Sequence, residues 1–193
     1  MAATPNRIAI DLHEAGDHQA VLTQLLRMSV GAEVLAVPID AVHEILEVGR
    51  LTALPRTPAF VRGVMNLRGA VVPVIDLAAL LGLDTASQDR RTCIVVVEVS
   101  ASRAAEGGLD AADDPDDESP AAFTVGLMVK AVHEVFEVGD EAIESVPPLG
   151  TAISPDWLSG MTRARGAIVG ILALDRALAP QWLSSLIAQP SEH

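Results

Sequence analysis

Two histidines, each followed by a glutamate, are the side chains best suited to acid–base chemistry. At His43 and His133 the neighbouring carboxylate could orient the imidazole as a general base. Both histidines belong to copies of one segment, AVHEILEVG at 41–49 and AVHEVFEVG at 131–139, which are identical at seven of nine positions. Copies of a segment tend to lie in separate subdomains, whereas a catalytic pair must converge on one substrate. We therefore interpret both histidines as polar residues on the exposed side of a short amphipathic turn.

Patterns for other reaction centres are missing from the sequence. It contains no G-x-S-x-G, G-x-x-x-x-G-K-[ST], G-x-G-x-x-G or H-E-x-x-H motif. Lys130 follows an apolar stretch and not a glycine-rich loop, so we expect a strand-end charge facing water. Cys93 lies in an apolar run, which is typical of a small buried hydrophobe. The acidic stretch 100–120 lacks the ligand order of a calcium loop, and we predict no catalytic residue, metal or cofactor.

Arg68 and Arg165 are better suited to binding than to catalysis, because each precedes a glycine in an expected strand-to-strand turn. An arginine held in this way presents five donors in a fixed fork, which matches carboxylates and backbone carbonyls. The acceptor could belong to the same chain or to a partner. Residue chemistry leaves both roles open, an internal brace and a partner contact.

The composition limits the classes of partner. The chain has 193 residues, 13 Lys and Arg against 26 Asp and Glu, and a net charge of −13, which would repel a nucleic acid. Half of the residues are apolar, but each long apolar stretch ends well before the roughly 18 to 20 residues that span a bilayer. The N-terminal residues do not resemble a secretory signal. We expect a cytoplasmic protein without direct membrane insertion.

A second repeated stretch extends the duplication. Residues 60–81 align with residues 157–178 at an offset of 97, and the glycines and arginines of the two turns coincide. Short apolar runs rich in Val and Ile predict strands, and short strands joined by polar turns favour small barrels. The predicted strands are Leu25–Val30, Val34–Val37, Val71–Ile75, Cys93–Val99, Phe123–Val129 and Ala167–Leu172.

Helices are few in this interpretation. Asp76 can cap a short helix over Leu77–Leu81, with Gly82 after its end, and Asp175 begins the equivalent helix. Gln181–Ile187 is predicted as a last helix. The predicted organisation is a flexible N-terminal arm (1–22), one domain of two intertwined subdomains (23–180, with repeats 41–81 and 131–178), a disordered acidic loop (100–120), and a C-terminal helix and tail (181–193).

One stretch of the first repeat carries a family resemblance. FVRGVMNLRG at 60–69 runs into VVPVIDL at 71–77, after the segment Val42–Leu46. In this the sequence resembles the CheW-like family of bacterial chemotaxis coupling proteins. The resemblance implies a mainly β fold of two SH3-like five-stranded β-barrel subdomains, pseudo-duplicated, with short helices.

The resemblance also implies a function without catalysis. Such adaptors couple chemoreceptors, the methyl-accepting chemotaxis proteins, to a CheA-type histidine kinase. One barrel joins the regulatory domain of the kinase, and the groove between the barrels receives the cytoplasmic tip of a receptor. The protein is then recruited to membrane-associated receptor arrays, in flagellar chemotaxis, pilus motility or surface sensing.

Five residues match family positions linked to these contacts. Val42 and Glu44 match positions in or beside the receptor contact, and Arg62, Gly63 and Arg68 match positions around the N-L-R-G turn that affect receptor or kinase coupling. Asn66 is expected to satisfy backbone groups of that turn.

The sequence departs from the family pattern at the acidic loop, which is inserted, and at Lys130, where an acidic residue is common. Two alternatives therefore stay open. One is a CheW-like regulatory module with a different partner, and the other is a small two-barrel enzyme that uses His43 and His133.

Overall fold

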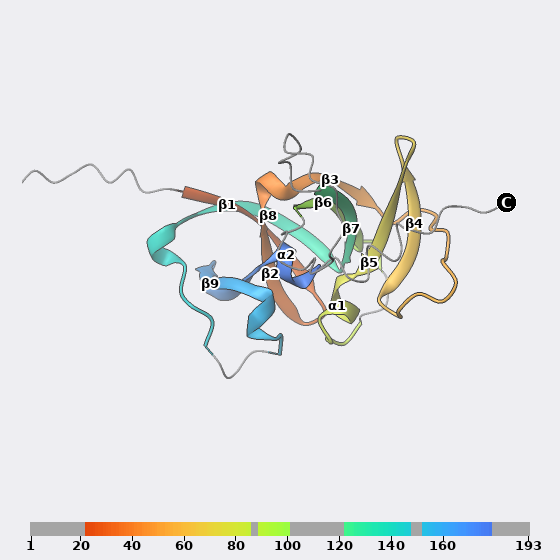
Figure 1. Cartoon of the computed structure of the whole chain (residues 1–193). Helices are drawn as coiled ribbons and strands as arrows, with labels where there is room; N and C mark the ends of the chain where they lie inside the picture. The colour runs from red at the N-terminus through yellow and green to blue at the C-terminus, as the bar shows by residue number, and fades with distance from the viewer. Residues whose placement is uncertain (1–21, 86–88, 101–121, 148–151, 179–193) are drawn as a thin grey trace, which may run out of the picture.

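The structure is a computed structural model that describes residues 22–85, 89–100, 122–147 and 152–178 (Figure 1). The predicted N-terminal arm, the acidic loop and the helix Gln181–Ile187 lie outside the described residues, apart from the residues at their edges. Within the described part of the chain, no helix is long and apolar enough to cross a membrane.

Ten strands form two five-stranded sheets. The first sheet, which we call subdomain 1, has the order β3-β6-β7-β5-β4, and the second, subdomain 2, has the order β8-β1-β2-β10-β9. Subdomain 1 contains β3 (Val42–Glu47), β4 (Val61–Leu67), β5 (Ala70–Asp76), β6 (Cys93–Ser100) and β7 (Ala122–Val129). Subdomain 2 contains β1 (Leu22–Val30), β2 (Glu33–Pro38), β8 (Ala131–Gly139), β9 (Leu158–Ala164) and β10 (Ala167–Leu172).

The two sheets are built from equivalent strands in the same order. Strands β3, β4 and β5 of the first repeat correspond to β8, β9 and β10 of the second, and the β6–β7 hairpin corresponds to the β1–β2 hairpin. The β1–β2 hairpin precedes the first repeat in sequence but pairs with β8 and β10 of the second. Subdomain 1 is therefore one continuous stretch of the chain, from β3 to β7, whereas subdomain 2 combines the strands that precede this stretch with those that follow it.

All six predicted strands are present, and the prediction of a mainly β fold with two five-stranded units is confirmed. The sheets are not closed into complete barrels, since no ladder in the described residues joins β3 to β4 or β8 to β9. The interpretation of the two AVHE segments as turns was wrong, because they form β3 and β8. Their alternating half-buried and exposed residues are typical of an edge strand with one wet face. Strands β4 and β9 were also not predicted.

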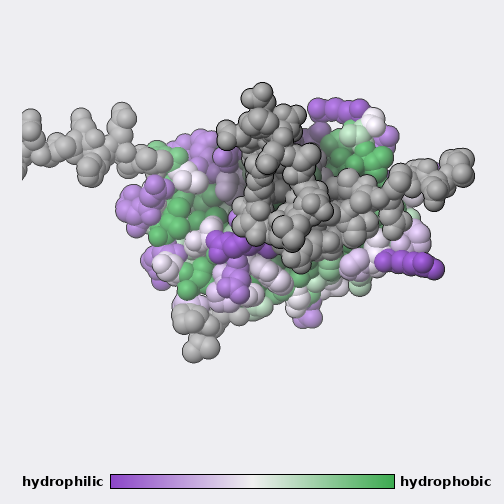
Figure 2. All heavy atoms as spheres, viewed as in Figure 1, coloured by the Kyte–Doolittle hydropathy of each residue, from purple (hydrophilic) through white to green (hydrophobic). Residues whose placement is uncertain are grey.

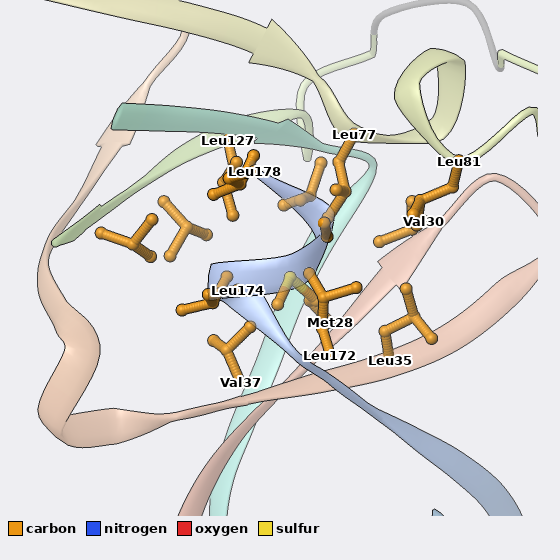
Figure 3. Close-up of a cluster of buried hydrophobic side chains, with 14 of the residues drawn as sticks. Met28, Val30, Leu35, Val37, Leu77, Leu81, Leu127, Leu172, Leu174 and Leu178 are labelled. Carbon is orange, nitrogen blue, oxygen red and sulfur yellow. The ribbon is translucent and has the colours of Figure 1, made fainter. Parts of the chain in front are cut away.

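The largest hydrophobic core lies between the two sheets (Figure 3). Met28, Val30, Leu35 and Val37 from β1 and β2 point toward Leu127 of β7 and toward leucines of the two short helices. Smaller clusters of buried residues lie within each subdomain, around Val169 in subdomain 2 and around Val74 in subdomain 1. The subdomains thus share one core and should unfold together.

The helices are short and belong to this shared core. Helix α1 (Leu77–Leu80) begins at the predicted cap, where Asp76 Oδ1 accepts a hydrogen bond from the Ala79 N–H at 3.2 Å. Helix α2 (Leu174–Ala177) is its counterpart but starts one residue before Asp175 and has no side-chain cap. Three 3₁₀ turns complete the described elements: η1 (Ile39–Ala41), η3 (Asp140–Ala142) and η4 (Pro155–Trp157).

Candidate docking surface

A groove of about 370 Å³ opens on subdomain 1, between β3 and the tip of the β4–β5 hairpin. Its rim carries His43 and Glu44 of β3 and Arg68 of the hairpin turn. Its walls and floor are mostly apolar, and include Leu67, Val71, Val72, Pro73, Val96 and Phe123. An apolar groove with a few charged groups on its rim is typical of a protein-binding surface.

One ion pair crosses the rim. Arg68 Nη2 lies 3.1 Å from Glu44 Oε2, while the Arg68 side chain stays 81 % exposed. The pair joins β3, at one edge of the sheet, to the turn of the β4–β5 hairpin at the other edge. Arg68 therefore braces its own fold, and its exposure leaves it open to a partner as well.

The turn that presents Arg68 is encoded locally. Arg68 and Gly69 both have positive φ, at 54° and 93°, as a two-residue hairpin with a type I′-like turn requires. Asn66 Oδ1 accepts a hydrogen bond from the Gly69 N–H at 3.0 Å, which confirms the role expected for this side chain. The arginine is thus held on a short and well-defined turn.

Exposed aliphatic side chains occur on β3 and β5, which contribute to the groove, and they recur in the other subdomain. Val71 is 70 % exposed on β5, and Ile45 is exposed on β3. Their equivalents in subdomain 2, Ile168 and Val135, are exposed too. Figure 2 shows hydrophobic surface next to strongly hydrophilic surface near the tip of the β4–β5 hairpin. Sequence reasoning missed these residues, although the alternation of outward and inward positions in each strand could have found them.

The structure does not bring the five predicted site residues into one place. Glu44 and Arg68 meet on the groove, whereas Val42 is half-buried against the core between the sheets. Arg62 lies in a separate cleft of about 390 Å³ between the subdomains. Gly63 has φ +133° and packs so closely that an added Cβ would clash with the Thr52 carbonyl oxygen.

The cleft that holds Arg62 also holds Lys130, the residue between β7 and β8. We predicted that Lys130 faces open water, but its side chain is half-buried in this cleft. The reason is that the chain crosses from one sheet to the other at this point. Asp76 lines the same cleft, so two cations and one carboxylate surround it.

The two histidines occupy equivalent positions in separate sheets. His43 Nε2 lies 3.0 Å from Glu98 Oε2 on β6, and His133 Nε2 lies 2.8 Å from Ser29 Oγ on β1. Each contact joins an edge strand to its neighbour, and both histidines are exposed. Their geometry is that of cross-strand surface pairs.

Cys93 is half-buried at the start of β6. Burial raises the pKa of the Cys93 thiol, and a hydrogen bond with the Val132 backbone acts in the opposite direction. Raising the pKa disfavours the reactive thiolate, although the side chain is half-buried and not fully buried as we expected.

Comparison with known proteins places this arrangement in a family. Residues 24–180 match the family model described as the CheW-like domain. The chain belongs to the CheW-like family. Chemotaxis protein CheW of Rhizobium meliloti is 30 % identical over 79 % of this chain and 84 % of the relative.

Other relatives carry different names. Protein PilI of Pseudomonas aeruginosa is 33 % identical over 65 % of this chain and 60 % of its own length. Among solved structures, the scaffolding protein TtCheW of Thermoanaerobacter tengcongensis has a TM-score of 0.66 and 27 % identity, over 82 % of this chain and 94 % of that one. The CheW-like chain is accordingly an adaptor of chemotaxis or of a related chemosensory pathway, in a family of scaffolding proteins.

Proposed function

We propose that the chain couples a chemoreceptor tip to the regulatory domain of a CheA-type histidine kinase, and that the groove on subdomain 1 docks one of these two partners. The proposal rests on one observation. The groove combines an apolar floor, the exposed Val71 and the rim pair of Glu44 and Arg68 in one place. A partner that covers Val71 gains apolar burial, and Arg68 offers donors to its carboxylate or carbonyl groups.

We propose that the partner that does not dock on the groove binds in the cleft between the subdomains. This cleft is similar in volume to the groove and carries Arg62 and Lys130. The family resemblance locates the receptor tip between the two barrels, and Val42 packs against the core that joins them. Gly63 supports both surfaces indirectly, because it lets the backbone of β4 approach Thr52.

We further propose that the chain acts by binding alone, in the cytoplasm, at membrane-associated receptor arrays. The histidines that suggested acid–base chemistry support this view, since His43 and His133 have partners in different sheets and do not form one pair. The pathway is flagellar chemotaxis, pilus motility or surface sensing, and the identity of the cognate kinase would decide among them.

The test uses Val71→Asp in the 193-residue chain, with Ile168→Asp as the matched control at the equivalent position of subdomain 2. Titration calorimetry measures the affinity for the kinase regulatory domain and for a receptor cytoplasmic fragment separately. We expect Val71→Asp to weaken one of the two complexes about tenfold or more, because a desolvated carboxylate replaces an apolar contact. Ile168→Asp should leave that same complex within about twofold of wild type. Equal behaviour of the two variants with both partners would refute the assignment of the groove.

A further inference from the structure

In subdomain 1 the glutamate of the rim pair contacts one arginine, whereas the equivalent glutamate of subdomain 2 contacts two. Glu134 Oε1 lies 2.7 Å from Arg165 Nε and 3.1 Å from Arg27 Nη2. Arg165 corresponds to Arg68 and Glu134 to Glu44. We call Arg27, Glu134 and Arg165 the arginine cluster.

The strand register shows what differs between the two copies. Glu44 is opposite Val96 in the β3–β6 ladder, and Val96 lines the groove of subdomain 1. The residue equivalent to Val96 on β1 is Arg27, next to the irregularity between Leu26 and Met28. A charged side chain thus replaces an apolar groove wall, and the local charge changes from zero to one net positive.

The two arginines that contact Glu134 differ in burial. The Arg27 side chain is only 16 % exposed, and its Nε is buried without a hydrogen-bond partner in the described residues. A guanidinium withdrawn from water needs a counter-charge far more than an exposed one does. Arg165 is 72 % exposed. One carboxylate thus faces two guanidinium groups, so that Arg165, although it makes the shorter contact with Glu134, shares this counter-charge with the buried Arg27.

We propose that the arginine cluster is a third docking surface, which receives a single carboxylate side chain of a partner protein. Only the Nε of Arg165 is used within the described residues, so its two terminal nitrogens can bind a carboxylate in a bidentate manner.

Charge selects this occupant. One net positive charge matches one carboxylate, whereas a phosphorylated or nucleic-acid ligand would bring more negative charge to a chain whose net charge is already −13. The surface lies on the other subdomain from the groove of Glu44 and Arg68. It adds a further contact to the proposed adaptor function, and its occupation does not depend on the groove.

The first experiment is an NMR titration of the ¹⁵N-labelled 193-residue chain with the blocked tripeptide acetyl-VEV-amide, and with acetyl-VQV-amide as the uncharged control. We expect the Arg165 Nε–Hε signal to shift in a saturable manner with VEV, with an apparent affinity at least about fivefold higher than with VQV. The Arg68 Nε–Hε signal should respond less, because Glu44 has no other cation to neutralise. Equal responses of Arg68 and Arg165, or of the two peptides, would overturn the proposal.

Two variants separate contact from positioning. Arg165→Gln removes the exposed fork and should abolish the saturable response, and the exposure of this side chain means that the fold should survive. Arg27→Met keeps a long apolar stem but frees Glu134 for Arg165, so the apparent affinity should fall about threefold although Arg27 does not contact the peptide. Unchanged binding by Arg165→Gln would refute the surface, whatever the behaviour of Arg27→Met.

Sedimentation of the wild type and of Arg165→Gln, each without peptide, tests whether the surface binds a second copy of this chain instead. A monomer at all concentrations agrees with a surface for another protein. Self-association that Arg165→Gln abolishes would assign the arginine cluster to a second copy of this chain and overturn the proposal.

Discussion

Arg68 and Glu44 join the two ends of one sheet, with Nη2 and Oε2 3.1 Å apart across the gap between the β4–β5 hairpin and β3. Backbone pairing does not join β3 to β4 in the described part of the chain. Arg165 and Glu134 repeat the relationship in subdomain 2. The pair sets the position of the groove wall relative to the edge strand, so its charges affect the shape of the surface as well as its chemistry.

Reversing the charge of Arg68 should affect binding much more than the free energy of unfolding. Arg68→Glu should change the free energy of unfolding by no more than about 1 kcal/mol, because exposed ion pairs contribute little. It should weaken the complex formed at the groove about tenfold or more. The partner loses the arginine donors, and the rim then carries two carboxylates that repel the partner's acceptor groups. Urea denaturation and titration calorimetry measure the two effects.

The double variant Glu44→Arg, Arg68→Glu is the control for the charge reversal. It restores an ion pair with opposite polarity and should recover the stability of the wild type. Binding should stay weak, because a partner recognises which strand carries the cation. Recovery of full affinity would mean that the pair only braces the fold.

Gly63→Ala should destabilise the chain by about 2 to 4 kcal/mol, because the new methyl group meets the Thr52 carbonyl at a backbone angle that L-residues rarely adopt. Gly49→Ala is the matched control, since an added Cβ there has no neighbour within 4 Å. Thermal and urea unfolding of both variants give the comparison. A loss of less than about 0.5 kcal/mol for Gly63→Ala would show that β4 can move away from Thr52.

Asp76→Ala should cost about 1 kcal/mol, since it removes the acceptor for the Ala79 N–H at the start of α1. Asp76→Ser keeps a capping oxygen and should recover most of the lost stability. The measurement is the urea midpoint at constant slope. If serine and alanine were equally destabilising, the charge of Asp76 in the cleft beside Arg62 would matter more than the cap.

Cys93 should react slowly in the folded chain. Because burial raises its pKa, the thiolate fraction near pH 8 is lower than in the unfolded chain, and labelling by a disulfide reagent should be about tenfold slower than in denaturant. The same shift has a consequence for stability. The folded state holds the thiol proton more tightly, so this contribution is present below the unfolded pKa of 9.0 and is lost as pH rises toward the folded value. Rapid labelling of the native chain at pH 8 would contradict the assignment.

Much of the local structure could be predicted because it depends on short-range chemistry. The Val- and Ile-rich runs predicted six strands, and Asn66 and Asp76 satisfy nearby backbone N–H groups, as their positions indicated. The strands β3 and β8 were missed because their polar residues, including the histidines, point outward along an edge and dilute the apolar pattern.

The candidate site was predictable only in part. Glu44 and Arg68 were named from family positions, but nothing local indicated that they would contact each other across 24 residues. Arg62 and Gly63 are neighbours of the same motif in sequence, yet the strand directs one into a cleft and packs the other against Thr52. Arg27 gave no signal at all, since its relation to Glu134 exists only through the β1–β8 ladder.

The sequence by itself determined the duplication, the mainly β class, the Arg-Gly turns and the family. Only the tertiary structure decided which hairpin completes which repeat. Both hairpins, β1–β2 and β6–β7, are apolar and consist of strands of similar length, so local preference cannot assign their partners. The choice is made where the chain crosses between sheets, through the turn Ile39–Ala41 and through Lys130, because the crossing puts each hairpin beside the repeat with which it shares a buried face.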